Sequence, residues 1–293
     1  SMNCVYCESG PLETLTLKRG PYVPAAEILG ELAAWEHARQ GRGEPRPDVV
    51  TLGGMGEPTL NSDMPEIIAG VRGILPGVPV AVLTNACLMT DARVRAELAG
   101  ADIVLPSLDA LTGDEYGAVN RPHPGVDPQA VARGVLDFRR EFGGKIWLEI
   151  LLVAGVNDSA ENLERLERYC RELRPDRVDV VTLSRPGTEA GARAVDADTL
   201  ARWLARLAPL ARPAGTAKGE AQAAEGLAPG AEKGQESPRG TVRDHAQERA
   251  QGDAQAGAAM LASLARRPQT AGQLAQALMI PEQSVHRILG RLE

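Results

Sequence analysis

Hydrophobic residues in this chain are concentrated in short runs that are separated by longer amphipathic stretches. The runs are rich in Val, Ile and Leu, which is typical of buried strands, and they lie at Val49–Leu52, Val78–Leu83, Asp102–Leu105, Ile146–Val153 and Val178–Leu183. Between them, apolar residues recur at the spacing of an amphipathic helix. Strands that alternate with helices predict βαβ units and a parallel sheet, closed or partly closed into a barrel.

Residues that favour helix N-termini stand at the start of these stretches. The predicted helices run from Pro24 to about Ala38, from Asn61 or Ser62 to Ile74, over Asp91–Leu98 after Thr90, over Pro128–Phe142 after Asp127, over Ala160–Leu173 after Asp158 or Ser159, and over Ala197–Leu210. These patterns predict one large α/β domain over residues 1–211.

The composition changes near Arg212. From there to about Gly252 the chain consists mainly of Ala, Gly, Glu, Gln, Lys and Pro. Such a segment buries too little surface to offset its ordering entropy, so we predict a disordered linker over 212–252. Short helical patterns follow at Ala254–Arg266, Ala271–Leu278 and Pro281–Leu292. The last two flank a tight connection and predict a small, winged-helix-like helix-turn-helix module over 253–293.

The bulk properties argue against several classes of protein. The 293 residues carry 32 basic and 39 acidic side chains, a formal charge of −7, which argues against broad electrostatic wrapping of nucleic acid. No apolar run approaches the ~20 residues of a membrane helix, and there is no secretory leader pattern. The 4 cysteines are too few and too scattered for a disulfide scaffold. We therefore expect a cytoplasmic protein that does not associate with membranes.

Only Cys4 and Cys7 stand at a spacing that carries chemistry. Two thiolates separated by two residues in a loop can share one metal ion or cluster. By itself the pair does not distinguish a zinc site, a redox-active dithiol and an iron–sulfur site, and it can also be two unliganded cysteines. Cys170 stands at core spacing on a predicted helix and Cys87 follows a strand, so both are interpreted as packing residues.

The motifs around this pair resemble those of the radical S-adenosylmethionine (SAM) superfamily, most of all the subgroup related to the wyosine tRNA-modification enzymes. Ser1–Cys7 resembles the end of the cluster loop Cys-x-x-x-Cys-x-x-Cys, with the first cysteine expected directly before Ser1. Thr51–Pro58 resembles the family's Gly-Gly-Glu element. The resemblance covers roughly the first two thirds of the chain, with supporting similarity in Leu83–Asn85, Pro106–Asp109, Asn120–Pro124, Trp147–Ile150 and Gly155–Asp158.

This resemblance implies a 4Fe-4S cluster that is held by three thiolates and binds SAM at its open iron. It implies an enzyme that cleaves SAM reductively to a 5′-deoxyadenosyl radical, with an electron donor such as a flavodoxin or ferredoxin. The implied fold is a partial (β/α)6 TIM-like barrel that lacks its first strand, because that strand precedes the cluster loop. With two of three thiolates, we expect this chain to be impaired and its intact parent to be active.

The glycine-rich turn Gly53–Glu57 follows a predicted strand. Gly53, Gly54 and Gly56 would allow the backbone to approach the methionine part of SAM, and Glu57 can help to bind its ammonium group. The alternative is an ordinary turn at the end of a strand.

Asn85, Ser107 and Asp109 follow the next two strands, and the carboxyl ends of the strands form the active site of a βα barrel. We expect these side chains to hydrogen-bond the SAM ribose, although each can instead satisfy loop backbone.

Glu149 alternates with Trp147 and Leu151 in a hydrophobic strand, so its carboxylate would point into the barrel. There it can contact SAM or substrate, or pair with Lys or Arg. We name it as a candidate catalytic residue.

Asn120, Arg121 and His123 form a compact polar loop before a predicted helix. Arg121 can steer an anionic substrate or the SAM carboxylate, and His123 can move a proton. We name Arg121 and His123 as further catalytic candidates, although a helix-entry loop fixed by two prolines also explains the segment.

The final predicted helix carries polar and basic side chains that suit contact with nucleic acid: Gln283, Ser284, His286, Arg287 and Arg291. A module that docks on protein is the alternative. Three classes of function follow. The first is a radical SAM enzyme that acts on RNA or another large substrate. The second is a radical SAM enzyme that acts on a small molecule or a protein, as in cofactor biosynthesis or glycyl-radical activation. The third is a metal-bearing regulator that binds DNA without catalysis.

Overall fold

The computed structural model contains a sheet of five parallel strands in the order β1-β2-β3-β4-β5 in its described part. They are β1 Val50–Leu52, β2 Val80–Thr84, β3 Ile103–Pro106, β4 Lys145–Leu152 and β5 Arg177–Thr182. Each coincides with one predicted apolar run, so the parallel α/β architecture is confirmed. Strands that are neighbours in sequence are also neighbours in the sheet, which is the connectivity of a βα barrel.

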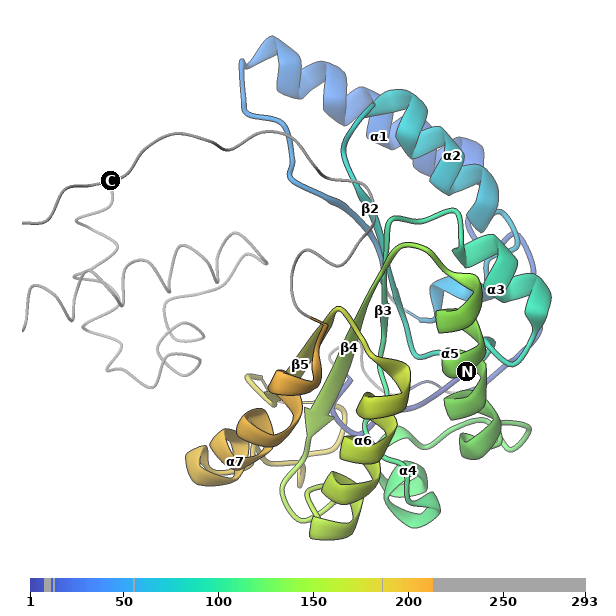
Figure 1. The fold of residues 1–293 in the computed structure, drawn as a ribbon. Coiled ribbons are helices and arrows are strands. Elements are labelled where there is room, and N and C mark those ends of the chain that lie inside the picture. The colour runs from blue at the N-terminus through green and yellow to red at the C-terminus, as the bar shows by residue number, and fades with distance from the viewer. Residues whose placement is uncertain (8–11, 13, 55, 186, 213–293) are drawn as a thin grey trace, which may run out of the picture. The chain divides into compact units, whose positions relative to one another are not determined.

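Helices lie along one face of this sheet (Figure 1). The helices α1 Ala25–Gly41, α2 Met64–Ile74, α3 Ala92–Leu98, α5 Pro128–Glu141, α6 Ala160–Leu173 and α7 Ala197–Leu207 correspond to predicted ones, and 3-10 turns occupy Pro58–Leu60 and Ala208–Leu210. Side-chain caps fix several starts, since Asp127 accepts a hydrogen bond from Gln129 N and Ser159 from Asn162 N. Two predicted starts need correction: α3 is capped by Asp91 rather than Thr90, and α2 begins after Asp63.

Helix α4, Gly113–Asn120, was not predicted. Its N-terminus is a capping box, in which Thr112 Oγ1 accepts a hydrogen bond from Glu115 N at 3.4 Å and its hydroxyl donates to the Glu115 carboxylate. Asn120 is therefore the last residue of a helix and not part of a free loop. Arg121 follows as its C-cap, in the left-handed region at φ 42°.

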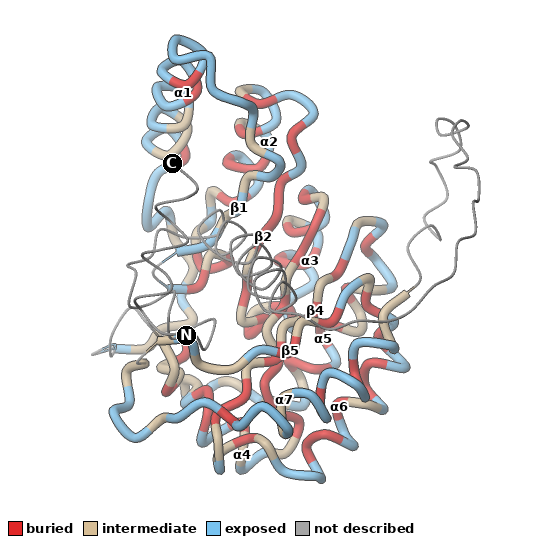
Figure 2. The backbone as a smooth tube through the Cα atoms, turned by 90° about the vertical axis from the view of Figure 1, so that its left-hand side faces the viewer, coloured by how far each residue is buried: buried red, intermediate tan, exposed pale blue. Residues whose placement is uncertain are grey.

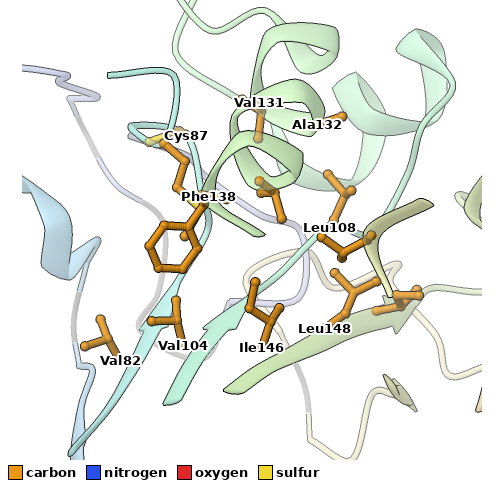
Figure 3. Packing of buried hydrophobic residues seen from close by; sticks show 14 of the residues in the cluster. Val82, Cys87, Val104, Leu108, Val131, Ala132, Phe138, Ile146 and Leu148 are labelled. Atoms are coloured by element: carbon orange, nitrogen blue, oxygen red, sulfur yellow. The ribbon is translucent and has the colours of Figure 1, made fainter. Parts of the chain in front are cut away.

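The core lies between the sheet and its covering helices. Alternate residues of β4 (Ile146, Leu148, Ile150 and Leu152) are buried, and α5 packs over this face of the sheet with Phe138 and Val131 (Figure 3). Trp147, Glu149 and Leu151 are half-buried and alternate with these residues, which confirms that they share the opposite face. Figure 2 shows buried residues along β2 and β4, as the pattern of apolar runs predicts.

The structure describes residues 1–7, 12, 14–54, 56–185 and 187–212. The chain divides into two units, Ser1–Thr216 and Ala217–Glu293, and all described residues belong to the first. The helix-turn-helix module and all of the predicted linker except Arg212 lie outside the described residues. Among the described helices, none is long and apolar enough to cross a membrane.

Candidate functional site

The segment Ser1–Cys7 lies against the end of α4. Met2 forms an antiparallel bridge with Pro122, and Val5 N donates a hydrogen bond to Val119 O at 3.0 Å. Because its backbone is paired in this way, the segment has a defined path before any ligand is bound.

Cys4 and Cys7 stand at the two ends of a tight turn. Cys7 N donates a hydrogen bond to Cys4 O at 3.1 Å, and both thiols are free and half-buried. Asn120 Nδ2 lies 3.5 Å from Cys4 Sγ and donates to it. Burial, assisted by the nearby Asp109 carboxylate, raises the pKa of Cys4 to about 11. A metal would therefore have to displace a proton from this thiol.

The carboxylate of Asp109 anchors the turn from the core. Its Oδ2 accepts hydrogen bonds from Tyr6 OH and from Asn120 Nδ2, both at 2.6 Å, and its Oδ1 accepts one from Leu151 N at 2.8 Å. The residue is only 1% exposed, and this burial raises the pKa of the carboxyl. Asp109 was expected to hold a ribose hydroxyl, but both of its oxygens are occupied inside the protein.

The loop after β5 holds the same turn from another side. Glu189 N donates to Val5 O at 3.0 Å, and Thr188 Oγ1 donates to Cys7 O at 2.8 Å. A Cβ atom on Gly187 would lie 2.5 Å from Tyr6 Cα, so only glycine allows the two backbones to approach this closely.

The glycine loop at the end of β1 faces open space. Gly54 and Gly56 have φ values of 140° and 102°, which side chains disfavour, and a Cβ on either would meet no atom within 4 Å. Gly53, Gly54 and Gly56 line a cavity of about 620 Å³, whose apolar wall includes Leu60 and Met64. This cavity is large enough for a small organic ligand.

Glu57 fixes this loop to the end of β2. Its Oε1 accepts hydrogen bonds from Thr84 Oγ1 at 2.5 Å and Thr59 Oγ1 at 2.6 Å, and its Oε2 accepts one from Asn85 N at 2.7 Å. Asn85 Nδ2 in turn donates to Ser1 Oγ at 2.9 Å. Asn85 therefore connects the glycine loop with the cysteine segment, and the Glu57 carboxylate shapes the loop from inside the protein.

Ser107 and Glu149 are brought together across the half-buried face of the sheet. They form a parallel bridge, and Ser107 Oγ lies 3.4 Å from Glu149 Oε1. Ser107 is therefore a direct hydrogen-bond donor to the Glu149 carboxylate.

Arg121 and His123 lie at the surface beside Ser1. Arg121 pairs with Glu189 at 2.9 Å, with both side chains nearly half exposed. His123 Nδ1 accepts a hydrogen bond from Gly125 N at 2.9 Å, and its backbone N–H donates to Ser1 O at 2.9 Å. These contacts give both residues a role in holding the N-terminal segment.

Several residues of this site were not predicted as functional, among them Tyr6, Asn120 and Gly187. Tyr6 stands between the two cysteines, and the sequence Thr112-x-x-Glu115 is a capping-box signal that would have placed Asn120 on a helix. No sequence signal identifies Gly187, because its role depends on contact with a distant backbone.

The donor set fits part of an iron–sulfur site. Two free thiols stand on one turn, and a glycine loop that faces a cavity is tied to the same segment through Asn85. Within the described residues there is no group of three or more His, Cys, Asp or Glu side chains that could hold a metal. A four-iron cluster at Cys4 and Cys7 therefore needs a further thiolate.

Comparison with known families identifies the superfamily. The Radical SAM superfamily model matches residues 1–184. The chain belongs to the radical SAM superfamily. These enzymes use a 4Fe-4S cluster and SAM, which are the cofactors that the resemblance of the sequence motifs implied.

Sequence relatives of this radical SAM chain include proteins of different description. It is 37% identical over 189 residues to a UPF0026 protein of Synechocystis sp., covering 64% of this chain and 65% of that protein. It is 30% identical over 192 residues to the dual-specificity RNA methyltransferase RlmN of Sorangium cellulosum, covering 63% and 46%. The chain thus spans less than two thirds of the length of these two relatives. It spans 28% of the length of a third relative, the GTPase Obg of Brachyspira hyodysenteriae.

A solved structure shares the fold. The structure of TYW1 with a lysine–pyruvate adduct bound superposes with a TM-score of 0.52 at 17% identity, covering 70% of this chain and 68% of that one. At this identity the likeness concerns the fold alone. It agrees with a partial TIM-like barrel.

Proposed function

We propose that this chain is the core of a radical SAM enzyme in which Cys4 and Cys7 hold two corners of a 4Fe-4S cluster and the glycine loop holds SAM. The observation that carries the proposal is the position of the cysteine turn. Buried Asp109 and Asn120 hold the cysteine turn, and Asn85 joins Ser1 to Glu57 of the glycine loop. The residues are thus arranged before either cofactor binds.

The bound cluster would supply the electron that cleaves SAM reductively to a 5′-deoxyadenosyl radical. The contribution of the chain is to bind and orient. The backbone of Gly53, Gly54 and Gly56 would lie against the methionine part of SAM. Glu57 and Asn85 would act by shaping the loop, since their polar atoms already bond Thr84, Thr59 and Ser1.

For the substrate we favour RNA or another large molecule. Support comes from the similarity to an RNA methyltransferase and from the polar and basic composition of 281–292. A small-molecule or protein substrate is the alternative, and a DNA-binding regulator without catalysis is the other class. An RNA-binding assay on the full chain and on a chain that ends before Ala254 tests the proposal that the substrate is RNA. RNA substrates predict binding that is lost on deletion, whereas equal binding by both chains contradicts a role of the module.

Cluster formation tests the cysteine assignment. The chain with one cysteine added directly before Ser1 is reconstituted anaerobically with iron and sulfide, and the iron content and EPR signal are measured. We expect one four-iron cluster per chain, loss of it in Cys4→Ser and Cys7→Ser, and full retention in Cys170→Ser, whose thiol is buried in α6. Equal iron content in Cys4→Ser and the parent would contradict the assignment.

A further inference from the structure

The side-chain amide of Asn120 lies between a proposed cluster ligand and a buried carboxylate. Its nitrogen is 3.5 Å from Cys4 Sγ and 2.6 Å from Asp109 Oδ2, so its two N–H groups are directed at two acceptors. Asn120 itself is 4% exposed. It stands at the C-terminal end of α4, which determines where the amide can reach.

The carboxylate of Asp109 determines which way the amide faces. Were the amide rotated, its oxygen would lie against Asp109 Oδ2, and two acceptors would repel each other. The observed orientation leaves Asn120 Oδ1 buried without a hydrogen-bond partner in the described part of the structure. An unpaired buried oxygen lowers the stability of the fold, because its lost contact with water is not replaced. The two hydrogen bonds to Cys4 and Asp109 are therefore formed at the expense of an unpaired Asn120 Oδ1.

Several backbone and side-chain hydrogen bonds fix the position of Asp109, and through it the position of the Asn120 amide. Its Oδ1 accepts from Leu151 N, and its carbonyl oxygen accepts from the amides of Asn157 at 2.9 Å and Asn162 at 3.1 Å. The same carboxylate accepts the hydroxyl of Tyr6, two residues after Cys4. One buried group thus holds both the thiol, through Asn120, and the middle of the turn.

We infer, on the basis of the proposed function, that Asn120 and Asp109 are positioning residues for the Cys4 thiolate. Asn120 donates a hydrogen bond to the ligand sulfur, and Asp109 keeps the amide in the donating orientation. Groups that orient a metal ligand in this way typically change metal affinity by about 10–100-fold. Hydrogen bonds to cluster sulfurs also set the reduction potential of the cluster.

Cadmium binding to the chain as it stands tests this role without a loaded enzyme. Cd²⁺ is titrated anaerobically into the full chain, and the thiolate-to-metal charge-transfer absorbance gives the dissociation constant. We expect Asn120→Ala to weaken Cd²⁺ binding by about tenfold. The matched control is Gln129→Ala, which removes a side-chain amide that donates to Leu111 O at 3.4 Å, and its affinity should stay within about twofold of the parent. Circular dichroism checks folding, and Asn120→Ser replaces Asn120→Ala if the latter is unfolded.

The outcomes separate the two proposals. If Cys4→Ser leaves the charge-transfer signal unchanged, the cysteine pair is not a metal site and the proposed function fails together with this inference. If Cys4→Ser removes the signal but Asn120→Ala binds Cd²⁺ as the parent does, the positioning role alone is overturned. In the reconstituted protein, the inference further predicts that Asn120→Ala shifts the cluster midpoint potential to a more negative value, and an unchanged potential contradicts it.

Discussion

The phenol of Tyr6 donates a hydrogen bond of 2.6 Å to the carboxylate of Asp109, a residue 103 positions later in the chain. This bond joins the middle of the cysteine turn to a buried group at the end of β3. Together with the loop after β5, it gives the turn a fixed place over the carboxyl ends of the strands. In a βα barrel, that edge is where ligands bind.

Removing the Tyr6 hydroxyl should destabilise the fold. Tyr6→Phe leaves a buried carboxylate with one donor fewer, so the free energy of unfolding should fall by about 1–3 kcal/mol. Urea denaturation measures this loss. The control is Tyr22→Phe, whose hydroxyl bonds Lys18 O at the surface, and it should change the free energy by less than about 0.5 kcal/mol. Equal losses in the two variants would contradict the anchoring role.

Gly187 should tolerate no side chain. In Gly187→Ala the new Cβ would lie 2.5 Å from Tyr6 Cα and 2.6 Å from Val5 O, so one of the two segments must move. We expect a loss of about 1–3 kcal/mol in the free energy of unfolding. Gly191→Ala is the matched control, because a Cβ there meets no atom within 4 Å. Thermal denaturation measures this loss. Equal melting temperatures for Gly187→Ala and Gly191→Ala would show that the loop after β5 does not hold the turn in place.

Glu57 should act on the fold as well as on SAM. Glu57→Gln sets an amide nitrogen against either the backbone N–H of Asn85 or the backbone N–H of Thr59. The unmatched donors should cost about 1–3 kcal/mol of unfolding free energy in the absence of SAM. Unfolding curves of the SAM-free chain measure this cost. If Glu57→Gln weakens SAM binding while these curves stay unchanged, Glu57 is a direct ligand and the structural role is wrong.

Acid should weaken α1 through Glu36. Hydrogen bonds from Arg39 and Gln40 lower the pKa of Glu36 from 4.5 to about 2 in the folded chain. The unfolded chain therefore binds the proton at higher pH, and the stability that Glu36 contributes is present above about pH 4.5 and lost as pH falls through about 2. Glu36→Gln should flatten the fall of the urea midpoint in this window. Glu31→Gln, an exposed change on the same helix, should leave that fall intact, and identical profiles for parent and Glu36→Gln would contradict the pairing.

The strands and most helices could be predicted because their signals are local. Apolar runs mark β1 to β5, and Ser159 and Asp127 cap helices where the sequence places them. Helix α4 was not predicted, because it is short, contains Gly117 and shows little amphipathic pattern. Its capping box was the available signal.

The candidate site could be predicted only in part. The spacing of Cys4 and Cys7 and the glycine loop are visible in the sequence. Whether a carboxylate after a strand faces a ligand or the core is not visible, and the structure turns both Glu57 and Asp109 inward. The contact between Asn120 and Cys4 spans 116 positions, so no local pattern predicts it.

The central claim is that this cysteine turn supports reductive cleavage of SAM. The most direct test adds a cysteine before Ser1, reconstitutes the cluster anaerobically, supplies dithionite and SAM, and measures 5′-deoxyadenosine by liquid chromatography. The account predicts 5′-deoxyadenosine from this chain, none from its Cys4→Ser variant and an undiminished amount from Cys170→Ser. Absence of 5′-deoxyadenosine from a chain that carries a complete cluster, or equal amounts with and without Cys4, would contradict it.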